Sequence, residues 1–277
     1  MKYPILLLAG RDLERRDLLK ALDPNGKYTS KVALPFLGKT VIEWVVEAFL
    51  KSKYVDDVYI LGLTEKDVKI NDPVHFIPVD PCSRISQKYK AGLDYITKAG
   101  KLTDKLIFCS GDCPGIQAEA IDQFIEAVHE RKGYDFVIGG VPEEILAAVI
   151  PNHKRGVGRF KDINILQGEI AYFSPRVINE LQDVIDSFTD PELRNKKSFW
   201  RTLWLVAKRP SSWSKIIKIV LKIGTLKDAA IAVSRAFKIK ADCVVIEDPG
   251  LAMDMDLPED YDKIRQYVAK IHNIEIT

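Results

Sequence analysis

The sequence predicts an α/β fold in which helices cover both faces of a mostly parallel sheet. Two observations indicate this class. Short, continuous apolar runs recur along the chain, as expected for strands buried on both sides, and segments with apolar residues at helical spacing separate them. With 277 residues, of which 47% are hydrophobic, the chain is long enough to bury a full core.

The expected strands begin at the N-terminus. The first apolar run, residues 3–8, ends in Ala9-Gly10, so a strand leads directly into a tight loop. Runs of similar length, bounded by polar or turn-forming residues, continue the pattern. We expect further strands over 55–61, 74–79, 105–109, 136–139, 145–150, 168–173 and 242–246.

The expected helices lie between these strands, and their first residues explain where they begin. Asp12 and Thr40 can each accept a hydrogen bond from a first-turn amide, and Pro175 suits the first helical position. Asp256 can cap the closing helix in the same way as Asp12. We expect helices over 12–22, 40–50, 84–98, 117–131, from 175 onward, over 214–223 and over 258–271.

Charge and cysteine usage exclude several classes of protein. The net charge of +2 is too small for a chain built to bind nucleic acid, so we expect no nucleic-acid partner. The four cysteines show no zinc-binding or disulfide spacing, which indicates a reducing, cytoplasmic compartment. The apolar start is too short for a signal peptide, and no apolar run approaches the roughly 18 residues of a membrane span.

The segment 192–240 breaks the alternation of strands and helices. We expect it to form a basic, tryptophan-rich helical insertion in a domain made of 1–191 and 241–277. Residues 194–240 hold thirteen Lys or Arg and one acid, a charge of +12, which leaves 2 − 12 = −10 for the rest of the chain.

The expected helix over 214–223 is unusually apolar. Lys215, Lys218 and Lys222 form a narrow polar stripe on it, so the helix should bury most of its circumference. It could pack under the main domain, cover an apolar substrate, or form a homodimer interface. It could also lie in a membrane interface, where Trp and Lys suit the headgroup level, and residues 196–223 would then make a peripheral membrane contact.

Two acidic segments, about 140 residues apart, can build one metal site. Asp112 follows an apolar run, so it lies where a buried strand should end and where α/β sheets place their ligands. Asp254 and Asp256 precede the closing helix. Two carboxylates from distant segments are a usual way to hold Mg²⁺ on a nucleoside triphosphate. Each motif also has a structural explanation, because Gly-Asp is common in turns and Asp-x-Asp before Pro starts helices.

Four motifs in chain order resemble those of the MobA-like NTP transferase family. They are Leu7-Leu8-Ala9-Gly10, the segment from Lys31 to Trp44, Ser110-Gly111-Asp112-Cys113-Pro114, and the segment from Asp254 to Asp260. The resemblance spans 1 to about 190 and 240 to 275, and leaves the basic insertion outside. It implies a three-layer, Rossmann-like fold of the GT-A type. It also implies a nucleotidyltransferase that uses Mg²⁺ to join an NTP to a small phosphorylated acceptor, with release of pyrophosphate.

The resemblance implies a role for each motif. In the family, a Leu-Ala-Gly-Gly loop wraps the nucleotide through backbone N–H groups, so the nucleotide-binding residues here would be Leu8, Ala9, Gly10, Arg11, Lys31 and Gly111. Arg11 replaces the second glycine of that loop and could itself contact the triphosphate. Arg15, Arg16 and Lys39 are further candidates for phosphate contacts.

The resemblance also implies the catalytic and metal-binding residues. Lys31 would neutralise charge at the α-phosphate, and Asp112 would be the first metal ligand. Asp254 or Asp256 would be the second ligand. If Asp256 caps the closing helix through its side chain, Asp254 is the better ligand.

The acceptor is expected across the second half of the sheet, near Gly139-Gly140, Gln167-Gly168-Glu169 and the basic insertion. Gly140, Gly168 and Glu169 are therefore the candidate acceptor-binding residues. Related enzymes often carry a Gly-Gly-Asn loop where this chain has Gln167 to Glu169, so Glu169 indicates a hydroxyl-bearing acceptor or a different geometry. The expected acceptor is a sugar, polyol or lipid-precursor phosphate. The Trp-, Ile- and Lys-rich insertion favours a lipid precursor, such as a polyol or isoprenoid-like phosphate.

Two other functions stay open. A GT-A glycosyltransferase would use Asp-x-Asp on a nucleotide-sugar, but that motif normally follows the central strand near residue 110, where this chain has Gly111-Asp112-Cys113-Pro114. A catalytically inactive nucleotide-binding module would explain the missing second glycine at Arg11. It predicts NTP binding without turnover.

Overall fold

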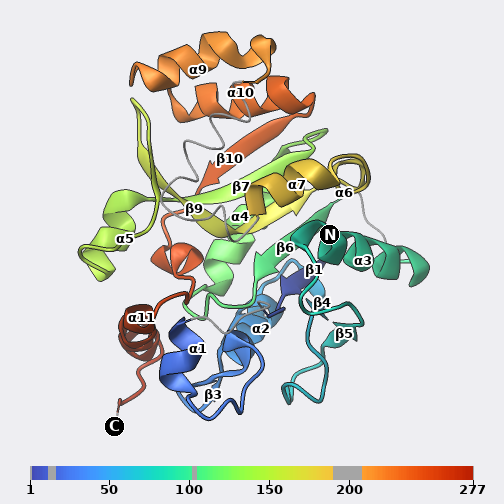
Figure 1. The fold of residues 1–277 in the computed structure, drawn as a ribbon, viewed down its shortest axis with the longest axis vertical. Helices are drawn as coiled ribbons and strands as arrows, with labels where there is room; N and C mark the ends of the chain where they lie inside the picture. Colours follow the sequence, from blue (N-terminus) through green and yellow to red (C-terminus); the bar gives the residue numbers. More distant parts are fainter. Residues whose placement is uncertain (1, 12–16, 102–104, 190–207, 277) are drawn as a thin grey trace.

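The computed structural model describes residues 2–11, 17–101, 105–189 and 208–276. A central sheet runs through the molecule in the order β10-β7-β9-β6-β1-β4-β5, and β8 pairs with β9 (Figure 1). Its strands are β1 (Tyr3–Leu8), β4 (Val55–Leu61), β5 (His75–Ile77), β6 (Leu106–Ser110), β7 (Phe136–Pro142), β8 (Val157–Arg159), β9 (Asn164–Phe173) and β10 (Ala241–Val245). β9 is antiparallel to β6, β7 and β8, whereas the other pairs are parallel.

Helices and short turns connect these strands. The helices are α1 (Asp17–Leu22), α2 (Val41–Lys51), α3 (Ile85–Lys98), α4 (Ala118–Glu130), α5 (Glu143–Val149), α6 (Pro175–Glu180), α7 (Gln182–Thr189), α9 (Trp213–Val220), α10 (Leu226–Phe237) and α11 (Pro258–Ile271). The 3-10 turns are η1 (Lys31–Ala33), η3 (Pro210–Ser212) and η4 (Pro249–Ala252), and β2 (Pro35–Phe36) forms a hairpin with β3 (Lys39–Thr40).

Alternate residues of the central strands face two different hydrophobic layers. Leu7 of β1 belongs to a buried cluster that contains Phe49 of α2 and Phe124 of α4. Its neighbour Leu6 belongs to another buried cluster, which contains Leu93 of α3. Both faces of the sheet are therefore covered by helices, which explains the continuous apolar runs and confirms the expected three-layer, mostly parallel α/β fold.

Local capping explains where two expected helices begin. Thr40 donates to Glu43 Oε2 from its backbone N–H at 2.7 Å and from its hydroxyl at 2.8 Å, directly before α2. Ser174 accepts from the Val177 N–H at 3.4 Å, and Pro175 occupies the first position of α6. These caps confirm the starts predicted at 40 and 175.

Two expectations about individual elements are wrong. Residues 145–150 do not form a strand, because Glu143–Val149 is the helix α5, with two acidic residues in its first turn. A short apolar run has no periodicity that distinguishes a strand from a partly buried helix, and Leu146 is the buried residue of this one. Asp256 does not cap the closing helix. Leu257 precedes α11, and its N–H donates to Asp260 Oδ2 at 3.3 Å.

The described part of the basic segment forms two helices at one end of the molecule (Figure 1). Ile216 of α9 packs with Ala232 and Ala236 of α10. Only Ile216 and Ile219 of α9 are buried, so the expectation that this helix buries most of its circumference is wrong for the described residues. Trp200 and Trp204 lie outside these residues, and the division into 1–191 with 241–277 and an insertion over 192–240 stays a prediction.

The length and apolarity of the helices bear on membrane insertion. In the part of the chain that the structure describes, no helix is long and apolar enough to cross a bilayer.

Candidate active site

The site lies where β1 and β6 end side by side. These strands are parallel, with Leu8 opposite Ser110, so the loops that follow them start at the same edge of the sheet. The Gly111 N–H donates to the Leu8 carbonyl oxygen at 2.8 Å, and the Met255 N–H donates to the Asp112 carbonyl oxygen at 3.1 Å. Main-chain hydrogen bonds thus join three segments that are far apart in the sequence.

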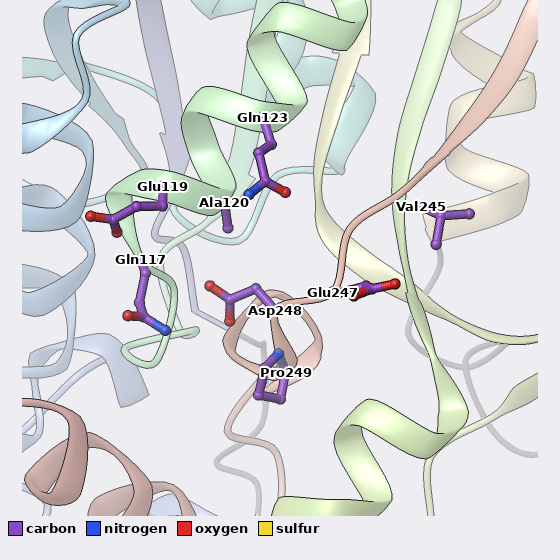
Figure 2. A pocket seen from close by; sticks show the side chains of 8 residues that line it. All are labelled: Gln117, Glu119, Ala120, Gln123, Val245, Glu247, Asp248 and Pro249. Atoms are coloured by element: carbon purple, nitrogen blue, oxygen red, sulfur yellow. The ribbon is translucent and has the colours of Figure 1, made fainter.

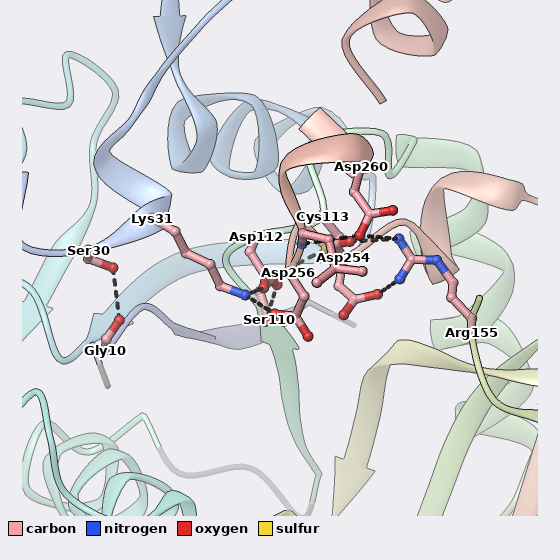
Figure 3. A network of polar contacts seen from close by, with 11 residues as sticks. Gly10, Ser30, Lys31, Ser110, Asp112, Cys113, Arg155, Asp254, Asp256 and Asp260 are labelled. Carbon is pink, nitrogen blue, oxygen red and sulfur yellow. Dashed lines mark hydrogen bonds and ion pairs between the residues drawn. The ribbon is translucent and has the colours of Figure 1, made fainter. Parts of the chain in front are cut away.

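Lys31 lies between two carboxylates at this edge (Figure 3). Its Nζ pairs with Asp112 Oδ2 and, at 2.5 Å, with Asp256 Oδ1. Asp112 is 3% exposed, and the Ser110 hydroxyl donates to its other carboxylate oxygen. Burial lowers the pKa of Lys31, but the charges of Asp112, Asp256 and Asp254 raise it by more, so its pKa lies well above the ordinary value. The side chain is therefore an ammonium ion at neutral pH.

Asp254 has a different partner from Asp256. Arg155, in the loop before β8, pairs with the Asp254 carboxylate, and its Nη2 donates to the Asp254 carbonyl oxygen at 2.6 Å. The same guanidinium lies 3.9 Å from Asp260 Oδ2 in the first turn of α11. Asp254 is thus fixed in the wall of the site, and Asp256 is the carboxylate that faces Asp112 across Lys31.

The acidic residues that the structure describes at the site can contribute two ligands to a cation, but they do not form a complete metal site made of protein ligands alone. Within the described ranges, no three His, Cys, Asp or Glu side chains are grouped so that they could hold a metal ion by themselves. Asp112 and Asp256 instead converge on one cation, the Lys31 ammonium. Carboxylate oxygens are the ligands that Mg²⁺ prefers, and Mg²⁺ is usually held by one or two carboxylates together with substrate phosphates. The pair fits such an ion.

The loop after β1 is held tightly against the protein. The Ser30 hydroxyl donates to the Gly10 carbonyl oxygen at 2.8 Å, and the Arg11 N–H donates to the Pro81 carbonyl oxygen at 3.1 Å. A Cβ on Gly10 would overlap Lys88 Nζ and lie 2.5 Å from the Pro81 oxygen, so only glycine fits there.

A small cavity separates this loop from the ion pair. Its volume is about 30 Å³, and its lining consists of Gly10, Arg11, Leu18, Leu19, Ser30, Lys31 and Asp256. The glycine loop, Lys31 and Asp256 are therefore neighbours, as the resemblance implied. The Ala9 N–H donates to the Leu61 carbonyl oxygen at 2.9 Å, so this amide holds the loop and does not face a ligand.

Among the other candidate phosphate contacts, Lys39 has partners elsewhere. Lys39 pairs with Glu47, and its Nζ lies 4.6 Å from the centre of the Trp44 ring. Arg15 and Arg16 lie outside the described residues.

The candidate acceptor residues lie on β7 and β9. A Cβ on Gly140 would lie 2.5 Å from Ile165 Cδ1, and one on Gly168 would lie 3.0 Å from Leu251 Cδ2. Close packing therefore explains both glycines. Glu169 is half-buried, and its negative charge is a smaller cause, after burial, of the raised pKa of Tyr89 on α3. An acceptor role for these residues stays a prediction.

Four residues that shape the site were not predicted as part of it: Ser30, Lys88, Ser110 and Arg155. Two of them carry a signal in the sequence. Ser110 directly precedes the Gly-Asp pair, and Lys88 interrupts the apolar face of the helix over 84–98. Arg155 carries none, because its loop meets Asp254 only in the folded chain.

A larger pocket lies at the N-terminus of α4 (Figure 2). It has a volume of about 670 Å³, and its lining consists of Gln117, Glu119, Ala120, Gln123, Val245, Glu247, Asp248 and Pro249. Burial raises the pKa of Asp248 to about 6, although the Gly250 N–H donates to its carboxylate at 2.7 Å. We call Lys31, Asp112 and Asp256 the Lys31 cluster. None of the residues that line the larger pocket belongs to it, so this pocket is distinct from the site predicted by the motifs.

Comparisons with known proteins indicate the family of the chain. Residues 25–192 match the family described as the MobA-like NTP transferase domain. No curated protein sequence matches the chain.

Solved structures share the fold at low sequence identity. A hypothetical transferase from Thermus thermophilus is 19% identical with a TM-score of 0.65, covering 94% of this chain and 100% of its own. A CMP:2-keto-3-deoxy-manno-octonic acid synthetase complexed with CTP is 14% identical with a TM-score of 0.54, covering 98% and 100%. A Mycobacterium tuberculosis protein in complex with manganese is 13% identical with a TM-score of 0.50, covering 95% and 97%.

The family match extends over more than half of the chain. It includes Lys31 and Asp112, which form an ion pair at the site. The sheet order and the helices on both of its faces agree with a Rossmann-like nucleotidyltransferase fold. The chain therefore belongs to the MobA-like NTP transferase family and is a nucleotidyltransferase.

Proposed function

We propose that this protein transfers a nucleotidyl group from an NTP to a small phosphorylated acceptor, releases pyrophosphate, and requires Mg²⁺. One observation carries the proposal. Lys31, Asp112 and Asp256, from three distant segments, converge beside the loop after β1. A reaction between two phosphate-bearing molecules brings negative charges together. It therefore needs cations at the reacting phosphates, which Lys31 and a metal ion on the two carboxylates would supply.

Asp112 and Asp256 are the residues that would hold the metal ion. Support comes from their shared cation in the structure and from their oxygen donors, which suit Mg²⁺. When bound, Mg²⁺ would neutralise negative charge on the nucleotide phosphates. Asp254 is engaged by Arg155, so we assign it the positioning of this segment and not metal ligation.

Lys31 would stabilise charge at the α-phosphate. In the transfer, an acceptor phosphate oxygen forms a bond to the α-phosphorus while the bond from that phosphorus to the β-phosphate oxygen breaks, and pyrophosphate leaves. Both reactants are anions, so positioning and cation contacts should supply most of the acceleration. An acceptor phosphate is already ionised at neutral pH, so the reaction needs no general base.

The loop Leu8-Ala9-Gly10-Arg11 and Gly111 would line the nucleotide site. The N–H groups of Ala9, Arg11 and Gly111 donate to carbonyl oxygens of the protein, so the nucleotide would be held by other atoms of these residues. Gly10 packs closely against Lys88 and Pro81 and also lines the small cavity beside Lys31. Arg11 is exposed at the rim of that cavity, where its guanidinium would reach the triphosphate. The acceptor would be a sugar, polyol or lipid-precursor phosphate that approaches near Glu169.

The test is pyrophosphate release from each of the four NTPs with Mg²⁺ and a panel of sugar, polyol and lipid-precursor phosphates. We expect release with one pair of substrates and its loss in Asp112→Ala. Asp56→Ala, at an exposed aspartate on β4, is the matched control and should keep full activity. Cleavage of a nucleotide-sugar without pyrophosphate release would favour the glycosyltransferase, and NTP binding without turnover would favour the inactive module.

A further inference from the structure

The helix α9 presents an apolar surface to solvent. Five large apolar residues on α9 and the turn after it are more than half exposed: Trp213 (55%), Ile217 (55%), Val220 (51%), Leu221 (62%) and Ile223 (55%). The first four recur at helical spacing, so they share one face of the helix. We call these five residues the α9 face.

A side of α9 that borders this face is already used for packing. Ile216 and Ile219, each 8% exposed, are its buried residues, and Ile216 contacts α10. Figure 1 shows the α9–α10 pair at the end of the molecule opposite α1 and α11, with α9 as the outer helix. The α9 face is therefore exposed on the outer helix of this end, opposite the end that holds α1 and α11.

The segment that carries the α9 face is strongly basic. Residues 208–240 contain nine Lys or Arg and a single acid, Asp228, which gives a charge of 9 − 1 = +8. That acid is 9% exposed and pairs with Lys215 at 2.5 Å. Apart from Lys215, the basic residues of this segment are all exposed: Lys208, Arg209, Lys218, Lys222, Lys227, Arg235, Lys238 and Lys240. The exposed charge of this region is therefore entirely positive.

We propose that the α9 face docks on an anionic membrane surface. Its Trp, Ile, Val and Leu side chains would enter the boundary between headgroups and acyl chains, and Lys218 and Lys222 would contact lipid phosphates. A second copy of the chain suits the face less well, because a symmetric contact would bring two regions of charge +8 together. Nucleic acid would not require a row of exposed aliphatic side chains. The proposal does not depend on the transferase reaction.

The first test is flotation of the full-length protein with vesicles, without nucleotide. One set contains phosphatidylcholine alone, and the other contains phosphatidylcholine with about one third phosphatidylglycerol. We expect binding to the anionic vesicles, weak binding to the neutral vesicles, and a decrease as salt concentration rises.

Two double variants separate the charged and apolar contributions. Lys218→Glu with Lys222→Glu should weaken binding at least about 25-fold, because each lysine lost near an anionic surface costs about fivefold. Ile217→Ser with Leu221→Ser should weaken binding at least about tenfold by removing apolar insertion. Lys98→Glu with Lys132→Glu, at two exposed lysines elsewhere, makes the same charge change and should lower binding by less than threefold. Thermal unfolding of each variant verifies that it is folded.

Three results would overturn the proposal. The first is no binding of the unmodified protein to anionic vesicles. The second is an equal loss in the α9 variants and in the Lys98 and Lys132 control. The third is a dimer in analytical ultracentrifugation that Ile217→Ser with Leu221→Ser converts to a monomer while vesicle binding is unchanged, since a second copy would then cover the α9 face.

Discussion

Arg155 holds Asp254 through both its side chain and its main chain. The guanidinium pairs with the Asp254 carboxylate and donates to the Asp254 carbonyl oxygen at 2.6 Å, and the two side chains are 15% and 12% exposed. Because Asp256 is only two residues further on, this contact fixes the backbone that presents Asp256 to Lys31 and Asp112. A residue outside the four motifs thereby positions the acidic segment.

Replacing Arg155 should harm both stability and activity. In Arg155→Gln the buried Asp254 carboxylate loses the charge of the guanidinium, so we expect a loss of about 3 kcal/mol in the free energy of unfolding. Urea unfolding measures this, and steady-state kinetics should show a lower kcat. Arg155→Gln with Asp254→Asn should recover part of the stability. The control is Arg159→Gln, which breaks an exposed ion pair with Glu143 and should change the free energy of unfolding by less than about 1 kcal/mol. An equal effect of the two substitutions would contradict the positioning role of Arg155.

Lys31 should be needed for turnover. Lys31→Met removes the cation at the α-phosphate, and we expect kcat to fall by about 10²- to 10³-fold. Lys39→Met serves as the control, because Lys39 pairs with Glu47 and should change kcat less than about threefold. Pyrophosphate release measures both variants. If Lys31→Met kept full kcat with a folded protein, the proposed charge stabilisation would be wrong.

The two aspartates before α11 should differ in their response to metal. We expect Asp256→Asn to raise the Mg²⁺ concentration for half-maximal activity at least about tenfold, because it removes a carboxylate that shares a cation with Asp112. Asp254→Asn should instead lower the free energy of unfolding, with a smaller change in the Mg²⁺ requirement. A Mg²⁺ titration of activity and urea unfolding separate the two effects. The reverse pattern would make Asp254 the metal ligand.

Asp248 should make stability depend on pH. Its pKa of about 6 in the folded protein lies above the ordinary value of 3.8, because burial disfavours the charged form. Above pH 6 the carboxylate is charged in both states, and burial then destabilises the fold. As pH falls from 6 towards 3.8, the folded protein binds a proton that the unfolded chain does not, so the contribution of Asp248 to stability rises by up to about 3 kcal/mol.

The variant Asp248→Asn tests this dependence. Its free energy of unfolding, relative to the unmodified protein, should be higher at about pH 7.5 than at about pH 4.5. Urea unfolding at both values gives the comparison. A relative stability that does not change between them would show that Asp248 titrates normally in the fold.

Local patterns were sufficient for most of the framework. The strands over 3–8 and 55–61 are confirmed at the predicted bounds, and the helix after Thr40 is confirmed with its cap. Continuous apolar runs need no knowledge of their partners, because a strand buried on both sides must be apolar throughout. The strand predicted over 145–150 is wrong, because an apolar run without clear periodicity also suits a helix such as α5.

The sequence by itself determined the class of fold and the family. It also indicated Lys31, Asp112 and the two later aspartates as candidate site residues. These depend on residue types at fixed spacing along the chain. Only the tertiary structure decided that Arg155 forms an ion pair with Asp254, that Asp256 forms one with Lys31, and that the α9 face is exposed. The physical reason is that ion pairing and burial are properties of distance in space. Folding brings together charges that are about 100 or more residues apart in the chain, and no local spacing records which partner each charge will meet.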